Sequence, residues 1–301
     1  METVNSLTAT SYVLLSLLLG YSLMSTNLLR RGEENVIFKY VMYVGMPALA
    51  FTSISKVQLD MGFLRASLSY ALSMASLSLS IFLLSKLLRW EREKTYLLIL
   101  IANFGNTGFF GVPFVSLAFG QGRPLQLSIF LWVLTFLFAS FIGIPMLESL
   151  KRGSSAIKAL RNPLLISVVL GLAASTLDLS FPQPISLFLD SLAATASPLA
   201  LISIGASIPS FNSIMKSKIS LFLLKTFISP AFSMIIGSIL RLEVIELNVL
   251  VIMSAMPVAI FLGVFSNEYE FYKEEVVAQI ALTSISAPLY LNLWLYLLSA
   301  L

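Results

Sequence analysis

Long apolar segments alternate with short charged clusters along the whole chain. The charged residues leave ten uncharged stretches: 3 to 29, 40 to 55, 66 to 85, 95 to 122, 124 to 147, 162 to 177, 191 to 215, 226 to 240, 247 to 267 and 276 to 301. A helix needs roughly 20 apolar residues, within a range of about 17 to 25, to cross the hydrocarbon core of a bilayer. Each stretch with its edges therefore predicts one transmembrane helix, which gives an all-α membrane protein with ten spans.

Two of the stretches have unusual lengths. The stretch at 226 to 240 reaches spanning length only if its helix begins near Lys216 and carries Lys225 into the membrane. The N-terminal stretch, "METVNSLTATSYVLLSLLLGYSLMSTNLL", begins with an acidic residue and is too long for a cleaved signal peptide. We interpret it as the first span.

Prolines indicate that the chain contains an internal repeat. The second, fourth and fifth spans of each half contain a proline, and the spacings are 66 and 32 residues in the first half and 59 and 31 in the second: Pro47, Pro113 and Pro145, then Pro198, Pro257 and Pro288. We therefore predict two five-helix halves, residues 1–150 and 151–301. Because five is odd, the second half is inverted, an arrangement that recurs in transporters whose substrate binds where discontinuous helices meet.

The composition supports a membrane environment and argues against most catalytic mechanisms. Of the 301 residues, 57% are hydrophobic and 11% are charged, and the mean hydropathy is +0.91. Cysteine and histidine are absent, as is a Gly-x4-Gly-Lys-Ser/Thr loop. Nucleophile and base pairs or metal clusters would need such residues, so we expect no enzymatic activity, no metal and no cofactor.

The basic residues predict the orientation of the chain. Fourteen of the nineteen lysines and arginines fall in the loops after odd-numbered spans, four fall in the opposite loops, and Lys225 lies within a span. Cytoplasmic loops carry the excess of basic residues, so both termini are expected on the outer side of the cell membrane. Basic loops on anionic lipid account for the net charge of +4, and no nucleic-acid partner is expected.

The fourth stretch contains an unusual set of residues, "IANFGNTGFFGVP" at 101 to 113. The polar groups of Asn103, Asn106 and Thr107 need partners at bilayer depth. Asn103 and Asn106 are three residues apart, so they would share one face of a helix. Three glycines and Pro113 favour a broken helix, whose exposed ends suit an anion. Close helix packing with the asparagines as interhelical links is the alternative. Met256-Pro257 in the matching place of the ninth stretch favours a site.

These residues resemble the auxin efflux carrier family, which includes the plant pin-formed auxin exporters and bacterial malate permease-like proteins. The most specific element is Asn106-Thr107-x-x-x-Gly111-x-Pro113 followed by Gly120. "SPLALISIGASI" in span seven and Pro257 followed by "VFSNEY" at 264 to 269 support it. The resemblance covers nearly the whole chain. It implies crossed fourth and ninth helices broken at prolines, and an elevator-type transporter in which helices 3–5 and 8–10 move against a scaffold of helices 1, 2, 6 and 7.

The resemblance also implies a substrate site and a homodimer formed through the scaffold helices. By matching positions, substrate-binding residues would be Asn103, Asn106, Thr107, Gly111, Pro113 and Pro257, with Thr52 and Ser53 on the scaffold side. The sequence departs from the family in two places. "PVAIFLGVF" lacks the polar side chain that many bacterial members have after the proline, and the loop between spans five and six is short. Both departures argue against auxin itself as the substrate.

Four other residues have competing interpretations. Lys225 lies about 10 Å into the membrane and is a candidate for binding an anionic substrate, but its flexible stem can snorkel to the headgroups, which we favour. Asp190 is the one acid expected inside the membrane, either as an interfacial residue or as a proton relay. Trp132 is interpreted as core packing rather than as a wall of the substrate path, and Trp294 as an interfacial anchor.

The resulting hypothesis is a secondary efflux carrier of small organic anions, such as auxin-like monocarboxylates or dicarboxylates. Coupling to sodium is not expected, because the crossing region offers Asn and Thr oxygens and no acid. Two alternatives stay open at this point. One is a sodium-coupled organic anion symporter of the bile-acid type, and the other is a membrane sensor that binds a ligand on the same fold without moving it.

Overall fold

The computed structural model describes residues 6–30, 32–56, 60–150, 163–206 and 217–300, and within these ranges the regular structure is entirely helical. Contacts divide the chain into two compact units. Unit 1 contains Met1–Asp60, Gly108–Val133 and Leu160–Ile208, and unit 2 contains Met61–Thr107, Leu134–Ala159 and Pro209–Leu301. Each unit draws on both halves of the sequence. The boundary at 150 and 151 adjoins residues 151–162, which lie outside the described ranges, and the division into two halves stays a prediction.

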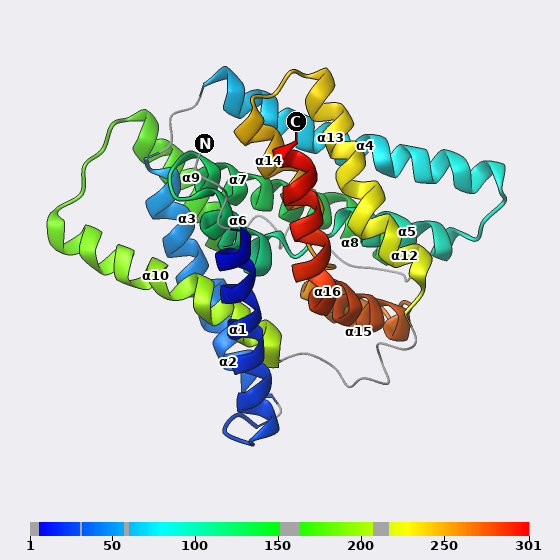
Figure 1. The fold of residues 1–301 in the computed structure, drawn as a ribbon, viewed down its shortest axis with the longest axis horizontal. Helices are drawn as coiled ribbons and strands as arrows, with labels where there is room; N and C mark the ends of the chain where they lie inside the picture. Colours follow the sequence, from blue (N-terminus) through cyan, green and yellow to red (C-terminus); the bar gives the residue numbers. More distant parts are fainter. Residues whose placement is uncertain (1–5, 31, 57–59, 151–162, 207–216, 301) are drawn as a thin grey trace. The chain divides into compact units, whose positions relative to one another are not determined.

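Unit 1 is built around the contact of its first and last helices. Its helices are α1 (Ser6–Ser25), α2 (Glu34–Tyr40), α3 (Met46–Ile54), α6 (Val112–Phe119), the first part of α7 (Arg123–Phe138), α9 (Pro163–Thr176) and α10 (Gln183–Ala206). Helix α10 packs against both α1 and α3 (Figure 1). At the α1–α10 contact the backbones approach so closely that a methyl group on Gly20 would overlap the carbonyl oxygen of Ile202. A methyl group on Gly205 would overlap that of Leu17.

Unit 2 places short helices between two long ones. Its helices are α4 (Met61–Leu87), α5 (Arg92–Asn103), α8 (Ile144–Glu148), α12 (Ile219–Leu223), α13 (Ser229–Ile239), α14 (Val244–Ser254), α15 (Ile260–Glu268) and α16 (Lys273–Ser299). Helix α13 packs between α4 and α14, and α5 also contacts α4. Leu100, Ile101, Val258 and Leu262 are at most 1% exposed and belong to one apolar cluster, so the ends of α5 and α15 share a core.

The described helices account for every apolar stretch of the sequence. Six continuous helical segments are long and apolar enough to cross a membrane: Glu34–Ile54, Met61–Leu87, Arg123–Glu148, Gln183–Ala206, Ile219–Ile239 and Lys273–Ser299. Four shorter apolar helices occupy the remaining stretches: Ser11–Ser25, Thr107–Phe119, Ile166–Thr176 and Val244–Ser254. These helices support a multi-pass membrane protein, while the number of ten spans stays a prediction. Lys225 lies inside Ile219–Ile239, as the length of its apolar stretch predicts.

Four prolines follow a wide helical turn. Five-residue π-helical turns at Val41–Gly45, Thr107–Gly111, Ala139–Gly143 and Leu224–Ile228 each end two residues before a proline: Pro47, Pro113, Pro145 and Pro230. A proline lacks an N–H group and its ring crowds the preceding turn. A local change to the wider i→i+5 pattern lets the helix continue past it. The fourth stretch is interrupted, as predicted, but the interruption lies at residues 104–106 and not at Pro113, which lies inside the helix Thr107–Phe119.

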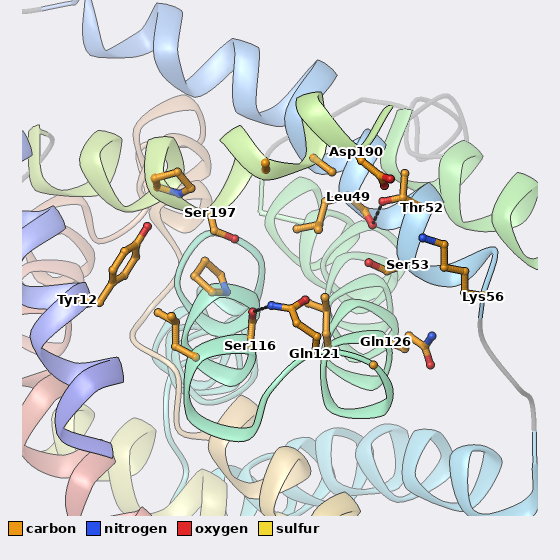
Figure 2. A pocket seen from close by; sticks show the side chains of 17 residues that line it. Tyr12, Leu49, Thr52, Ser53, Lys56, Ser116, Gln121, Gln126, Asp190 and Ser197 are labelled. Carbon is orange, nitrogen blue, oxygen red and sulfur yellow. Dashed lines mark hydrogen bonds between the residues drawn. The ribbon is translucent and has the colours of Figure 1, made fainter. Parts of the chain in front are cut away.

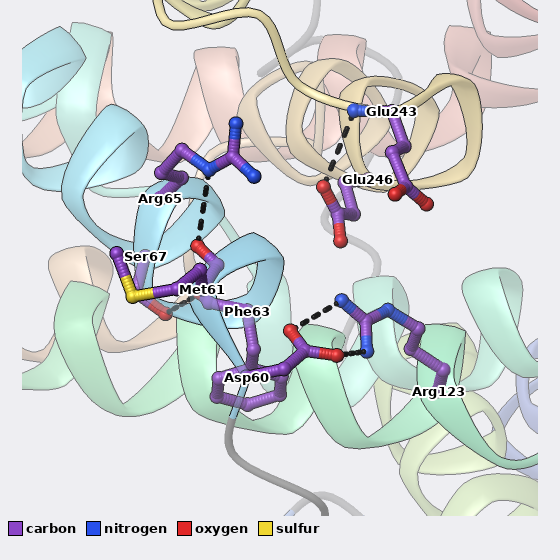
Figure 3. A network of polar contacts seen from close by, with 8 residues as sticks. All are labelled: Asp60, Met61, Phe63, Arg65, Ser67, Arg123, Glu243 and Glu246. Atoms are coloured by element: carbon purple, nitrogen blue, oxygen red, sulfur yellow. Dashed lines mark hydrogen bonds and ion pairs between the residues drawn. The ribbon is translucent and has the colours of Figure 1, made fainter.

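Polar contacts hold the ends of two helices. In unit 1, the Arg123 guanidinium forms a bidentate pair with the Asp60 carboxylate at 2.6 and 2.8 Å, which links the segment after α3 to the start of α7 (Figure 3). In unit 2, Glu243 and Glu246 form a reciprocal capping box that begins α14 (Figure 3). Glu246 is 1% exposed, so an acid that the sequence analysis left out is buried, and it stabilises a helix end.

Candidate functional site

Two helices of unit 2 are interrupted, and the interruptions pair with each other. Helix α5 ends at Asn103 and the next helix begins at Thr107, while α14 ends at Ser254 and α15 begins at Ile260. The backbone N–H of Asn106 donates to the Pro257 carbonyl at 2.6 Å. The N–H of Ala259 donates to the Phe104 carbonyl at 2.9 Å, and Gly105 faces Val258 as an antiparallel bridge. The two non-helical segments thus satisfy each other's backbone groups away from water.

The pairing leaves two helix-end carbonyl groups without their usual donors. In a continuous helix the N–H of Asn106 would donate to the Ala102 carbonyl, but it donates to Pro257. Likewise, the N–H of Val258 donates to Thr283 Oγ1 at 3.0 Å instead of to the Ser254 carbonyl. The carbonyl oxygens of Ala102 and Ser254 therefore lie at the negative ends of α5 and α14.

Lys225 supplies the missing donors. Its Nζ donates to the Ala102 carbonyl at 3.2 Å and to the Ser254 carbonyl at 3.1 Å. The Ser229 hydroxyl also donates to the Ala102 carbonyl, at 2.8 Å. The Lys225 side chain is 1% exposed, so the snorkelling interpretation is wrong. Snorkelling would move the ammonium group away from two carbonyl oxygens that carry the negative ends of helix dipoles.

A tryptophan holds the turn that contains Lys225. Pro230 has no N–H to donate to the Thr226 carbonyl, and this carbonyl instead accepts a hydrogen bond from Trp294 Nε1 at 2.8 Å. Trp294 is 5% exposed. Its interpretation as an interfacial anchor is therefore wrong, because the indole N–H has a buried acceptor on the neighbouring helix.

Asn103 and Asn106, which the sequence analysis placed on one helix face, differ in their partners. Asn103 ends α5, and its Nδ2 donates to Ser78 Oγ and to the Ile99 carbonyl, both at 3.0 Å. Asn106 lies beyond the helix end, so the expected shared face does not exist. Asn106 Nδ2 and Thr107 Oγ1 are buried and have no hydrogen-bond partner. Asn103 thus links α5 to α4, whereas Asn106 and Thr107 carry unused polar groups at the interruption.

A cavity of about 490 Å³ lies within unit 1, and it contains three of the predicted site residues, Thr52, Ser53 and Pro113. Figure 2 shows Thr52 and Ser53 with Lys56 and Asp190 along the same cavity. Other polar side chains come from α1, α6, α10 and the segments around α7: Tyr12, Ser116, Gln121, Gln126 and Ser197. The cavity is therefore amphipathic, and the described residues that line it include one cationic and one anionic side chain.

Gly111 and Trp132 have packing positions in unit 1. Gly111 is buried at the end of the π-helical turn that precedes Pro113. Trp132 is 7% exposed, and a methyl group on Gly108 would overlap its indole ring. The interpretation of Trp132 as core packing is confirmed, because the ring fills the space beside a glycine.

Sequence comparisons identify the group of proteins to which this architecture belongs. The protein family described as "Membrane transport protein" matches residues 6–156 and 150–295, which together cover nearly the whole chain. The chain belongs to this auxin efflux carrier-like family of membrane transport proteins. An uncharacterized transporter of Methanocaldococcus jannaschii is 26% identical over 302 residues, which cover 95% of this chain and 96% of the relative. One from Methanothermobacter thermautotrophicus is 28% identical over 291 residues, which cover 94% and 95%.

In this membrane transport protein, sequence analysis missed several polar residues of the unit 1 cavity. Lys56, Gln121 and Gln126 lie at or just beyond helix ends, where charged and polar residues are ordinarily explained by the aqueous interface. Asp190 was noted, and it is exposed and lines the cavity. Lys56 follows Thr52 by one helical turn, and this spacing places both residues on the same side of the chain. The sequence does not show that α10 packs beside that turn.

Proposed function

We propose that this membrane transport protein is a secondary carrier that exports small organic anions, such as auxin-like monocarboxylates or dicarboxylates, without coupling to sodium. One observation carries the proposal: Asn106 Nδ2 and Thr107 Oγ1 are buried at the interruption and have no partner. An unsatisfied buried polar group costs about 1–3 kcal/mol. A substrate oxygen that accepts hydrogen bonds from both groups would remove this cost, so the arrangement supports a site for an acceptor-rich ligand.

The charges near the interruption support an anion as that ligand. Thr107 opens the helix Thr107–Phe119, whose first N–H groups have no partner within the helix and form the positive end of its dipole. Helix N-termini of this kind favour carboxylates and phosphates. Lys225 adds a positive charge nearby, since a methyl group on Gly105 would lie 3.0 Å from its Nζ. Lys225 thus favours an anion through its charge, while Asn106 and Thr107 are the direct donors.

The same geometry argues against a sodium-coupled symporter. A sodium site needs several oxygen ligands. The carbonyl oxygens of Ala102 and Ser254 would suit a cation, but both accept hydrogen bonds from the Lys225 ammonium group. This observation favours the sodium-independent alternative.

The proposed transport cycle uses alternating access by an elevator motion, with scaffold helices 1, 2, 6 and 7 and moving helices 3–5 and 8–10. Thr52 and Ser53 line a cavity of about 490 Å³, a volume that suits a small organic acid. An inside-negative membrane potential would drive anion export by about 2.3 kcal/mol per charge for each 100 mV. In unit 2, Asn103 and Pro257 shape or support the interruption rather than donate to the substrate.

Counterflow in proteoliposomes tests the proposal. Labelled indole acetate and malate are exchanged in sodium-free buffer by the wild-type protein, by Asn106→Ala and by the matched control Asn292→Ala, which removes an amide from α16. We expect exchange by the wild type and the control, and a loss of about tenfold or more in Asn106→Ala, because a hydrogen bond to a charged group is worth about 1.5–3 kcal/mol. Equal exchange by all three proteins would reject the site.

The counterflow test also separates the carrier from a sensor. A sensor would bind the labelled acid to detergent-solubilised protein but would produce no counterflow, with or without sodium. Counterflow that appears only when sodium is added would favour the symporter.

A further inference from the structure

We propose that the Lys225 ammonium group is a built-in replacement for the exchangeable cation that a coupled carrier would bind at the paired interruptions. Removing the side chain should therefore open a site for a small monovalent cation. The inference deepens the proposed function and rests on it for the consequence that transport is independent of sodium. The cation site itself can be tested without knowledge of the transported substrate.

The position of the ammonium group carries the inference. In carriers with discontinuous helices, unwound carbonyl groups and the C-terminal ends of half-helices coordinate the coupling cation. Here the two equivalent carbonyl groups belong to Ala102 and Ser254, and each lies four residues before an N–H that has been diverted to another acceptor. Lys225 Nζ lies 3.2 and 3.1 Å from these two oxygens. The ammonium group therefore takes a place defined by both interruptions.

The surroundings of Lys225 form a cation site rather than an ion pair. The small cavity beside it, about 10 Å³, is lined by hydroxyl groups, one amide and apolar side chains: Tyr70, Ser73, Met74, Leu77, Asn103, Ser229, Ser233 and Ser254. No carboxylate lines this cavity among the described residues. Its volume approaches the lower limit for one water molecule, so it leaves no room for a second cation beside the ammonium group.

Among the described residues, no carboxylate lines the cavity beside Lys225, so burial of this lysine lowers the stability of the folded protein. Removing an ammonium group from water is expensive, and helix-end carbonyls compensate only in part. Intramembrane lysines of this kind mark functional sites. The energetic cost is consistent with a charge that is kept because the crossing needs a cation at this point.

Two variants separate the charge of Lys225 from its volume. Lys225→Ala removes the ammonium group and leaves space, whereas Lys225→Met removes the charge and fills most of that space. Each variant is reconstituted in choline buffer, and sodium or n-propylammonium, which matches the deleted fragment, is added at about 100 mM. Thermal unfolding of the detergent-solubilised proteins under the same conditions reports cation binding without any substrate.

We expect wild-type exchange and wild-type Tm to be the same in all three buffers. In choline, exchange by both variants should fall by about tenfold or more. Sodium or propylammonium should restore exchange by Lys225→Ala and raise its Tm by several degrees, while Lys225→Met should respond to neither cation. A Lys225→Ala protein that folds only when one of the cations is present would also support the site.

Three results would overturn the inference. The first is wild-type exchange by either variant in choline alone, because the charge would then be dispensable. The second is a folded Lys225→Ala protein whose Tm and exchange respond to neither cation. The third is a Lys225→Ala protein that stays unfolded in every buffer, which would make Lys225 a folding residue. If the wild type exchanges no carboxylate, the proposed function fails, while the thermal measurement still decides the cation site.

Discussion

Residues that look alike in the sequence have different roles around the paired interruptions. Asn103 uses its amide to join α5 to Ser78 of α4, as the alternative of interhelical links describes. Asn106, three positions later, keeps an amide group without a partner, as a ligand site requires. The difference arises because α5 ends between them, so that the backbone of Asn106 pairs with Pro257 instead of Ala102. Single-residue experiments at this crossing therefore probe different functions even at neighbouring positions.

Gly105 allows the Lys225 ammonium group to lie against the non-helical segment that follows α5. In Gly105→Ala the added methyl group would lie 3.0 Å from Nζ and 3.5 Å from Cε, which forces the ammonium group away from its carbonyl acceptors. We expect counterflow to fall by about tenfold or more, since hydrogen bonds from a charged donor are lost. Gly143→Ala is the control, because its methyl group would meet only the flexible end of Leu100, at 3.1 Å. Unchanged counterflow in Gly105→Ala would show that the ammonium position does not matter.

At the scale of elements, the sequence predicts which segments are helical better than it predicts where they are interrupted. Ten uncharged stretches predict ten apolar helical regions because burial in lipid selects composition over a long window. The position of a helix interruption depends on which acceptor binds a single backbone N–H group. Pro113 looks like a breaker, yet the π-helical turn Thr107–Gly111 absorbs it. The actual interruption at Phe104–Asn106 exists because the segment around Pro257 supplies alternative backbone partners.

At the candidate site, too, the sequence does not predict contacts between residues that lie far apart along the chain. The motif around Asn106 predicts unusual polar groups in the membrane, and in the structure Asn106 Nδ2 and Thr107 Oγ1 are buried without a hydrogen-bond partner. The partners of Lys225 are 123 and 29 residues away in the sequence, and helix periodicity carries no information about them. The sequence of a single segment shows only the flexible stem of the lysine, which favours snorkelling. The acceptors become evident only when both interruptions are seen together.

The contact of α1 with α10 gives a prediction at the element scale. A methyl group on Gly205 would overlap the Leu17 carbonyl, and backbone atoms cannot move aside as a side chain can. We expect Gly205→Ala to lower the unfolding free energy by about 1–3 kcal/mol, measured by thermal unfolding in detergent with tryptophan fluorescence. Gly171→Ala is the matched comparison, since its methyl group would meet the Ile54 side chain at 3.1 Å and the Phe51 carbonyl oxygen at 3.3 Å without overlap, and it should cost less. Equal Tm values for the two variants would argue that α1 and α10 do not pack this closely.

At the scale of the whole molecule, the basic loops give a prediction about sidedness. The positive-inside distribution, fourteen basic residues against four, predicts that the loop before α5 lies in the cytoplasm and the loop between α9 and α10 lies outside. The chain has no cysteine, so a single introduced thiol is labelled without background. Glu91 and Leu179 are exposed residues of these two loops. We expect a membrane-impermeant maleimide to label Leu179→Cys in intact cells, and Glu91→Cys only after permeabilisation.

The labelling experiment decides the topology, whereas the direction of transport needs a flux measurement. With either topology, the inside-negative potential favours export of an anion, by about 2.3 kcal/mol per charge for each 100 mV. Labelling of Glu91→Cys but not Leu179→Cys in intact cells would invert the topology and contradict the positive-inside assignment. Proteoliposomes with a potassium diffusion potential provide the matching flux measurement, in which anion efflux should accelerate when the cytoplasmic side is made negative.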